Sequence, residues 1–168
     1  MSQATALYDL HLHTGWSYDA TARMETYFMA ARRNGVRCLA ITDHHLIDGL
    51  DEMHAVARAY PDVRVIPAVK AASGLIVIAH PFNYFQKHDL TRMDALRDVC
   101  QLDGIECAHS TVPPKYGARY RVYCEQHGLF STGGSDCHDE SSIDQMFARH
   151  GGPAAWLDEF LAVIDGRP

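Results

Sequence analysis

Residues 7–13, Leu7-Tyr8-Asp9-Leu10-His11-Leu12-His13, join a short apolar run to two histidines. The run has the length and composition typical of a β-strand. In an extended chain alternate side chains project from the same side. His11 and His13 therefore lie on the same face and can bind one metal ion. The stretch therefore predicts a strand that ends in a pair of metal ligands.

Further apolar runs alternate with longer amphipathic stretches, which is the pattern of repeated βα units around a parallel sheet. The expected strands are Leu7–His11, Arg37–Thr42, Val63–Val69, Leu75–His80, Gly104–Ala108 and Leu129–Gly133. The expected helices are Met24–Asn34, Ile47–Tyr60, Leu90–Leu102, Pro114–His127 and Ala154–Ile164. Gly35, the Asp103-Gly104 pair and Gly128 are expected to end helices or turn the chain. The sequence thus predicts an α/β fold with a parallel sheet.

One connection is too short for this pattern. Only residues 70–74 separate Val69 from Leu75, whereas adjacent parallel strands need a crossover of about a dozen or more residues. Two interpretations follow: the two runs pair antiparallel, or the chain has lost a segment here.

Length and composition restrict the class of protein. The 168 residues, 47% of them hydrophobic, support one core, so a single domain over residues 1–168 is expected. The formal net charge of -6 provides no basic field for a nucleic-acid backbone, and any phosphate must be held locally. The longest strongly apolar run, Leu75–Ala79, is too short to span a bilayer, and the first residues lack a signal-peptide layout. We therefore expect a cytoplasmic protein without membrane contact.

The cysteines and the histidines lead to different predictions. The five cysteines are scattered, without a Cys-x-x-Cys pair, which argues against both a disulfide framework and a structural zinc knuckle and favours buried thiols. The eleven histidines are many for this length, and several lie beside another ligand-type residue.

Four of the six apolar runs end in such residues. Beyond His11 and His13, they supply Asp19 in Ser17-Tyr18-Asp19-Ala20, then Thr42-Asp43-His44-His45, Ala79-His80-Pro81 and Gly133-Gly134-Ser135-Asp136-Cys137-His138. The C-terminal ends of parallel strands share one face, so these side chains are expected to converge. A lone histidine such as His80 is more often a surface residue than a ligand. Four independent clusters are harder to explain without a metal site.

The same motifs, together with Gly104-Ile105-Glu106, resemble the PHP (polymerase and histidinol phosphatase) family, in order from residue 7 to about residue 140. The resemblance implies a distorted (β/α)7 barrel, here truncated to about six strands. It also implies a centre of two or three metals that hydrolyses phosphomonoesters or nucleic-acid phosphodiesters. By this resemblance His11, His13 and Asp136 serve one metal, Asp19, His44 and His138 serve another, and His80 serves a third.

The chain departs from the family pattern after its third strand. Relatives carry a metal-bridging Glu there and a further His before the Ala-His-Pro strand. Here Lys70 takes the Glu position, and the stretch with the His is absent. A charged lysine cannot ligate a cation. One or two divalent ions (Zn, Mn or Fe) are therefore expected rather than three, and an ordered metal beside the Lys70-Ala71 junction would restore the third.

The favoured function is hydrolysis of a small phosphomonoester, a nucleotide or an oligonucleotide phosphate by metal-activated water. Asp43 or His109 is a candidate proton carrier or phosphate partner, and Lys115, Arg119 or Arg121 a candidate phosphate partner. Two alternatives remain: a metal-binding PHP remnant that has lost turnover with its bridging Glu, and an amidohydrolase-like enzyme that cleaves C–N or C–O bonds. Loops such as Asn83–Asp89 and Thr111–Tyr116 are expected to set specificity. Strand edges left open by the missing segment favour a homodimer.

Overall fold

The structure, a computed structural model, describes residues 6–44, 49–67, 75–85 and 89–166. His45, Lys70 and the Lys70-Ala71 junction lie outside these ranges, so the expectations attached to them stay predictions. The chain forms two compact units, residues 1–69 with 134–151 (unit 1) and residues 70–133 with 152–168 (unit 2). The single domain expected from the composition likewise stays a prediction.

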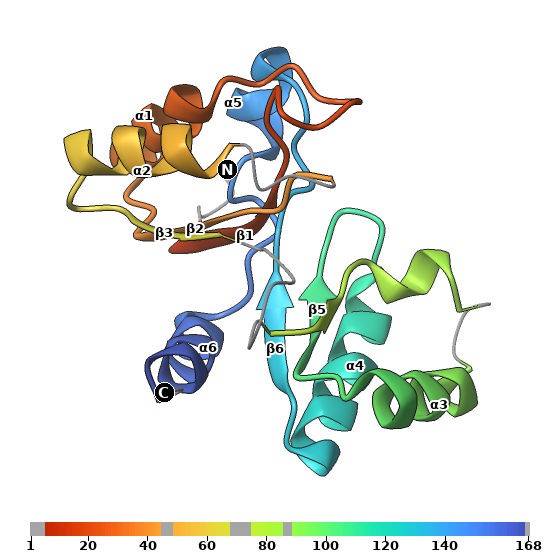
Figure 1. Cartoon of the computed structure of the whole chain (residues 1–168). Coiled ribbons are helices and arrows are strands. Elements are labelled where there is room, and N and C mark those ends of the chain that lie inside the picture. Colours follow the sequence, from red (N-terminus) through yellow and green to blue (C-terminus); the bar gives the residue numbers. More distant parts are fainter. Residues whose placement is uncertain (1–5, 45–48, 68–74, 86–88, 167–168) are drawn as a thin grey trace. The chain divides into compact units, whose positions relative to one another are not determined.

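Unit 1 contains a three-stranded parallel sheet in the order β1-β2-β3, formed by β1 (Tyr8–Leu12), β2 (Cys38–Ile41) and β3 (Arg64–Pro67). Helices α1 (Met24–Asn34) and α2 (Leu50–Ala59) lie together on one side of this sheet (Figure 1). After unit 2 the chain returns to unit 1 through a 3-10 turn, η2 (Glu140–Ser142), and the short helix α5 (Ile143–Met146).

The core of unit 1 follows from the helical spacing of α1. Met24, Tyr27, Phe28 and Ala31 recur at helical intervals and are all buried. They pack in one cluster with Leu12 and Leu39 of the sheet and with Ile143 and Phe147. Gly35 then ends the helix with a left-handed φ of 72°, and its N–H bonds to the Ala31 carbonyl. The predicted helix stop at Gly35 is confirmed.

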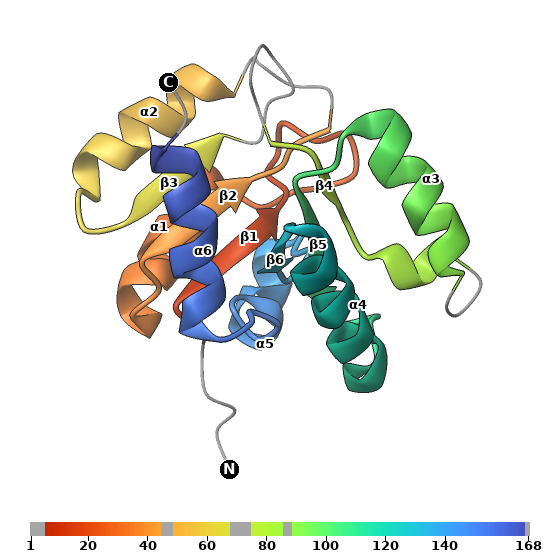
Figure 2. The same ribbon diagram turned by 90° about the horizontal axis from the view of Figure 1, so that it is seen from below.

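Unit 2 contains a second three-stranded parallel sheet, with β4 (Val77–Ile78), β5 (Gly104–Ala108) and β6 (Phe130–Gly133) in that order. Its other elements are the 3-10 turn η1 (Pro81–Asn83) and the helices α3 (Leu90–Cys100), α4 (Pro114–His127) and α6 (Ala154–Asp165). Viewed as in Figures 1 and 2, α4 and α6 lie on opposite sides of β5 and β6. The core contains Met93 of α3, Ile105 of β5 and Tyr120, Tyr123 and Cys124 of α4.

All six predicted strands are present, and all are parallel to their neighbours. The expected α/β fold with about six strands is therefore confirmed, with the strands divided between two sheets rather than closed into a barrel. The interpretation that the two runs flanking the short connection pair antiparallel is wrong for the described strands, because β3 and β4 lie in different sheets.

The five predicted helices are also present, with α2 and α3 shorter than expected. The Asp103-Gly104 pair does not end α3, because Gln101 takes the left-handed position with a φ of 51°. Gly104 instead lies inside β5, where a Cβ would stand 2.4 Å from the Phe130 ring. The elements η1, η2 and α5 were not expected, since each is too short to show a hydrophobic period.

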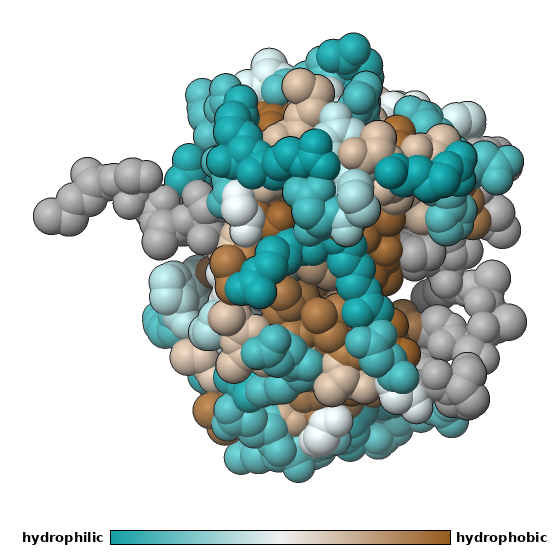
Figure 3. Space-filling view, turned by 90° about the vertical axis from the view of Figure 1, so that its left-hand side faces the viewer, coloured by the Kyte–Doolittle hydropathy of each residue, from teal (hydrophilic) through white to brown (hydrophobic). Residues whose placement is uncertain are grey.

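The structure can be compared with the expectations for membrane contact, cysteine burial and dimerisation. Among the described helices, none combines the length and the apolar character that crossing a membrane would require. Four of the five thiols are buried, as predicted, and Cys100 is half-buried. Hydrophobic residues still reach the surface on the face shown in Figure 3, and Met29 of α1 is 58% exposed. The homodimer suggested by open strand edges stays a prediction.

Glu140 gives unit 1 a specific acid sensitivity. Its carboxylate accepts hydrogen bonds from Thr26 Oγ1 and Arg23 Nε, both at 2.6 Å, which join η2 to the start of α1. These bonds lower the pKa of Glu140 from 4.5 to about 2. A carboxyl with a depressed folded pKa stabilises the fold above its unfolded pKa, and this contribution is lost as the pH falls from about 4.5 toward 2. Between about pH 4.5 and pH 2, the Tm of E140Q should therefore fall less than the Tm of the wild type, as measured by circular dichroism. Equal decreases in Tm would contradict the assignment.

Candidate metal centre

Strand β1 places its polar side chains on one face. Asp9, His11 and His13 alternate with the apolar Tyr8, Leu10 and Leu12, and all six are buried. Burial of three polar side chains on one strand is costly unless each has partners. The contacts of this face therefore indicate how the site is built.

The segment that follows β6 runs along β1 in parallel. Leu12 and Cys137 form a parallel bridge, Asp136 N–H donates to the His11 carbonyl at 2.9 Å, and His13 N–H donates to the Cys137 carbonyl at 3.1 Å. Gly134 permits this approach, since a Cβ there would lie 2.3 Å from His11 Cβ. Asp136 has a left-handed φ of 56°, which Asp tolerates better than most residues. The result brings Asp136 and His138 beside His11 of β1 and His13, which directly follows the strand.

Asp9 fixes the same segment from inside. Its carboxylate accepts hydrogen bonds from the backbone N–H groups of Ser135 at 2.9 Å and Ala148 at 2.8 Å, and from that of His11 at 3.4 Å. Complete burial raises the pKa of Asp9 to about 6, although these hydrogen bonds act in the opposite direction. Sequence reasoning assigned Asp9 no role, because backbone donors so far away along the chain leave no local pattern.

His11, His13 and Asp136 form the tighter of the two clusters in unit 1. His11 Nε2 lies 3.1 Å from His13 Nε2, and Asp136 Oδ1 lies 3.2 Å from the former and 3.3 Å from the latter. An ion bound at about 2.0–2.2 Å holds neighbouring N and O ligands roughly 3.0–3.5 Å apart. The three donor atoms therefore have the spacing of ligands to one transition-metal ion.

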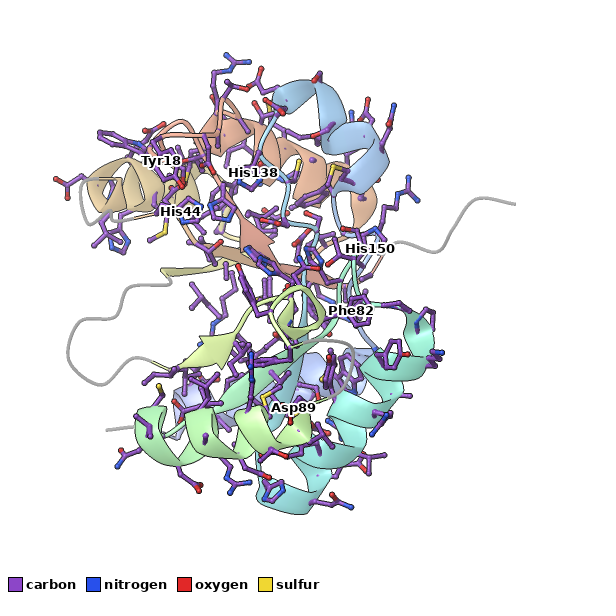
Figure 4. The ribbon with its side chains drawn as sticks, turned by 90° about the vertical axis from the view of Figure 1, so that its right-hand side faces the viewer. Tyr18, His44, Phe82, Asp89, His138 and His150 are labelled. Carbon is purple, nitrogen blue, oxygen red and sulfur yellow. The ribbon has the colours of Figure 1, made fainter. Side chains whose placement is uncertain are left out.

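Asp19, His44 and His138 form the second cluster. Asp19 Oδ2 lies 3.6 Å from the Nε2 atom of each histidine. Donor atoms of His13, His44 and His138 also lie within 4.8 Å of one another, so His13 borders both clusters. Figure 4 shows His44 and His138 next to each other in unit 1. The Nδ1 atom of His138 lies 2.9 Å from the Asp136 carbonyl, a contact that directs Nε2 toward Asp19.

Asp43 has its oxygens occupied by the loop after β1. It accepts hydrogen bonds from Thr14 N–H at 2.5 Å, Thr14 Oγ1 at 2.7 Å and Ser17 Oγ at 2.7 Å. Ser17 Oγ lies 3.3 Å from His13 Nδ1 and accepts a hydrogen bond from His44 N–H at 3.0 Å. These contacts favour a positioning role for Asp43, through Ser17, on one histidine of each cluster.

The electrostatics of unit 1 favour neutral imidazole at His13. Burial lowers the pKa of His13, and the neighbouring His11, His138 and His44 lower it further, against the opposing effect of Asp136. Neutral imidazole is the form that ligates metals. His13, a candidate ligand, is therefore favoured in the form that can bind a cation.

The remaining candidates, His80 and His109, lie in unit 2 with Glu106. His80 precedes Pro81 with a φ of 29°, and its N–H donates to Glu106 Oε2 at 2.7 Å. The rings of His80 and His109 are 5.1 Å apart, and His109 Nδ1 lies 2.9 Å from Thr111 Oγ1. Glu106 is buried, yet sequence reasoning gave it no role. The sequence did contain one signal for such a role, namely a carboxylate placed between Ile105 and Cys107 in a core strand.

Two of the expected phosphate partners, Arg121 and Lys115, make different contacts in the structure. Arg121 is occupied, because its guanidinium pairs with Glu159 at 2.7 and 2.9 Å and with Glu125 at 2.8 Å. This pairing disfavours Arg121 as a phosphate ligand. The ammonium of Lys115 lies over the Tyr116 ring, 4.7 Å from its centre.

Comparison with known proteins agrees with this architecture. The family model described as the PHP domain matches residues 9–122, more than half of the chain. The chain belongs to the PHP family. Among curated proteins no match was found.

Solved structures share the PHP fold. A predicted metal-dependent phosphoesterase from Bifidobacterium adolescentis superposes with a TM-score of 0.74 at 17% identity, covering 92% of this chain and 95% of its own. An amidohydrolase from Chromobacterium violaceum, with bound sulfate and no metal, gives 0.71 at 16% identity, covering 93% and 96%. A two-domain protein from Bacteroides vulgatus containing a predicted PHP-like metal-dependent phosphoesterase gives 0.61 at 17% identity, covering 82% and 53%.

Gly134 offers a test of how this PHP domain builds the first cluster. In G134A the new methyl would meet His11 Cβ at 2.3 Å, so Asp136 should shift away from the two histidines. Affinity for Zn or Mn, measured by calorimetric titration, should fall at least about tenfold. G15A is the matched control, because its Cβ would meet nothing nearer than the Ala22 carbonyl at 3.9 Å. Equal affinities of the two variants would refute the close-approach argument.

Glu106 can be tested separately in unit 2. E106Q keeps an oxygen that accepts from His80 N–H, whereas E106L removes the acceptor of this partly buried donor. E106L should therefore lose about 1–3 kcal/mol of unfolding free energy, and E106Q less than half as much. Urea unfolding measures both. If E106Q is as damaging as E106L, the negative charge rather than the acceptor is what the site needs.

Proposed function

We propose that this PHP domain is a phosphoesterase that hydrolyses a phosphomonoester, a nucleotide or an oligonucleotide phosphate with divalent metal ions. The observation that carries the proposal is the triangle of His11, His13 and Asp136 donor atoms, with sides of 3.1–3.3 Å. Polar residues that meet by chance have no reason to adopt the spacing of metal ligands where two of them are buried and the third is half-buried. The second cluster, next to the first and bordered by the same His13, supports a centre of more than one ion.

Each residue has a proposed task in this scheme. His11, His13 and Asp136 hold one ion, and Asp19, His44 and His138 hold another. Ions bound there would neutralise the phosphate oxygens and lower the pKa of water for attack on phosphorus. Asp43 positions the ligands through Ser17, which touches both His13 and His44. The mixed imidazole and carboxylate ligands suit Zn, Mn or Fe.

The two histidines of unit 2 keep the tasks expected from the sequence. We propose His80 as a further metal ligand and His109 as a proton carrier. Thr111 Oγ1, which lies 2.9 Å from His109 Nδ1, orients the His109 ring. Glu106 holds the His80 backbone.

The charge of the chain supports a small substrate over a long nucleic acid. With a net charge of -6, the protein has no basic field for extended polyanion binding. The phosphate would instead be held by the ions themselves. The names of the solved neighbours include both a phosphoesterase and an amidohydrolase, so C–N bond cleavage is the second candidate. Elemental analysis followed by phosphate ester, amide and lactone panels separates the two.

The ligand assignment has a direct test with matched controls. H11A and D136N each remove one corner of the triangle. Each should lower the metal content by about one ion per chain and the hydrolysis of an aryl phosphate by more than about 100-fold. H54A and D144N make the same chemical changes at exposed positions of unit 1 and should match the wild type. Metal content is read by plasma mass spectrometry and activity by phosphate release with added Mn or Zn. Activity that survives both chelation and H11A would refute the proposal.

A further inference from the structure

Tyr18 is an aromatic side chain held in solvent beside the second cluster. It is 82% exposed, and its ring centre lies 5.3 Å from that of His44 with 29° between the planes. Figure 4 shows it close to His44 and His138. One face of the ring therefore contacts a candidate metal ligand, and most of the remaining ring surface is in contact with water.

The loop that carries Tyr18 is tied down on both sides. Before it, Ser17 N–H bonds to the Thr14 carbonyl at 2.8 Å and Ser17 Oγ bonds to Asp43. After it, Thr21 and Ala22 N–H both bond to the His138 carbonyl, at 2.9 and 3.1 Å. These bonds hold the backbone of Tyr18 next to the cluster, and the ring contacts His44. A pre-organised, exposed ring loses little conformational entropy when a ligand covers it.

The neighbouring Trp16 makes a different set of contacts. Its indole N–H donates to Glu52 at 2.6 Å, and its ring lies over Gly49, where a Cβ would come within 2.9 Å of the indole. Trp16 therefore packs the loop against α2 and its first residues. Of the two aromatic residues in this loop, Tyr18 is therefore the one whose ring surface is open to a ligand.

We propose that Tyr18 stacks on a planar aromatic group of the substrate, so that the site prefers phosphate esters carrying such a group, as nucleotides do. The inference rests on the proposed phosphoesterase function, because the phosphate at the metal centre brings the rest of the ester alongside His44 and Tyr18. Base-on-aromatic stacking covers apolar ring surface and tolerates different bases. Tyr18 is a specificity residue in this scheme and takes no part in the chemical step.

The test compares AMP with ribose 5-phosphate, which carry the same phosphorylated sugar carbon and differ by the base. For the metal-loaded full chain we expect a KM for AMP about 5- to 150-fold lower than for ribose 5-phosphate, with similar kcat. Y18L should raise the KM for AMP to that of ribose 5-phosphate and leave the latter unchanged. Y18F keeps the ring and should behave as the wild type. M29A, a change at another exposed apolar residue of unit 1, is the control.

Calorimetric measurement of the binding of AMP and ribose 5-phosphate separates the stacking proposal from the proposed phosphoesterase function. If AMP and ribose 5-phosphate bind equally, or if Y18L keeps the preference, the stacking proposal is overturned whether or not hydrolysis occurs. If AMP binds more tightly and Y18L abolishes the difference, but neither compound releases phosphate, the stacking role stands and the proposed function fails.

Discussion

The candidate metal centre depends on one buried carboxylate. Asp9 accepts hydrogen bonds from the N–H groups of Ser135 and Ala148, residues more than a hundred positions away, and thereby holds the returning chain against β1. That attachment adds to the backbone hydrogen bonds that hold Asp136 and His138 beside His11 and His13. The full burial of Asp9, which raises its pKa to about 6, is the energetic cost of this arrangement.

Two backbone features complete the attachment. Gly134 lets the returning segment approach β1 more closely than any side chain would allow, and the left-handed φ of Asp136 then turns its carboxylate toward the histidines. Strained or closely packed backbone of this kind persists only where the surroundings determine it. The parallel bridge between Leu12 and Cys137 and the hydrogen bonds around it provide that determination. Ligand geometry is therefore a property of the fold of unit 1 rather than of single side chains.

The sequence predicted what is periodic and missed what is not. The six strands follow from short apolar runs, and the joint projection of His11 and His13 follows from the period of two in an extended chain. That Asp136 and His138 meet them could be inferred, because both follow the end of a parallel strand. The partners of Asp9 and Glu106 could not, since they are backbone N–H groups at distant positions, which carry no side-chain signature. The pairing of Arg121 with Glu159 was also not predicted, because the two residues lie on different helices that are far apart in the sequence.

The loop of residues 14–22 connects the geometry of the candidate metal ligands to the proposed recognition of the substrate. Thr14 and Ser17 bond to Asp43, Ser17 contacts His13 and His44, and Asp19 reaches His44 and His138. Tyr18 lies between Ser17 and Asp19, so its position is fixed by the same bonds that fix the ligands. A change that moves this loop would alter metal binding and aromatic recognition together, whereas a change confined to the Tyr18 ring should alter recognition alone. Because the ring contacts the cluster only through one face of His44, the two properties are separable in experiment even though one short segment carries both.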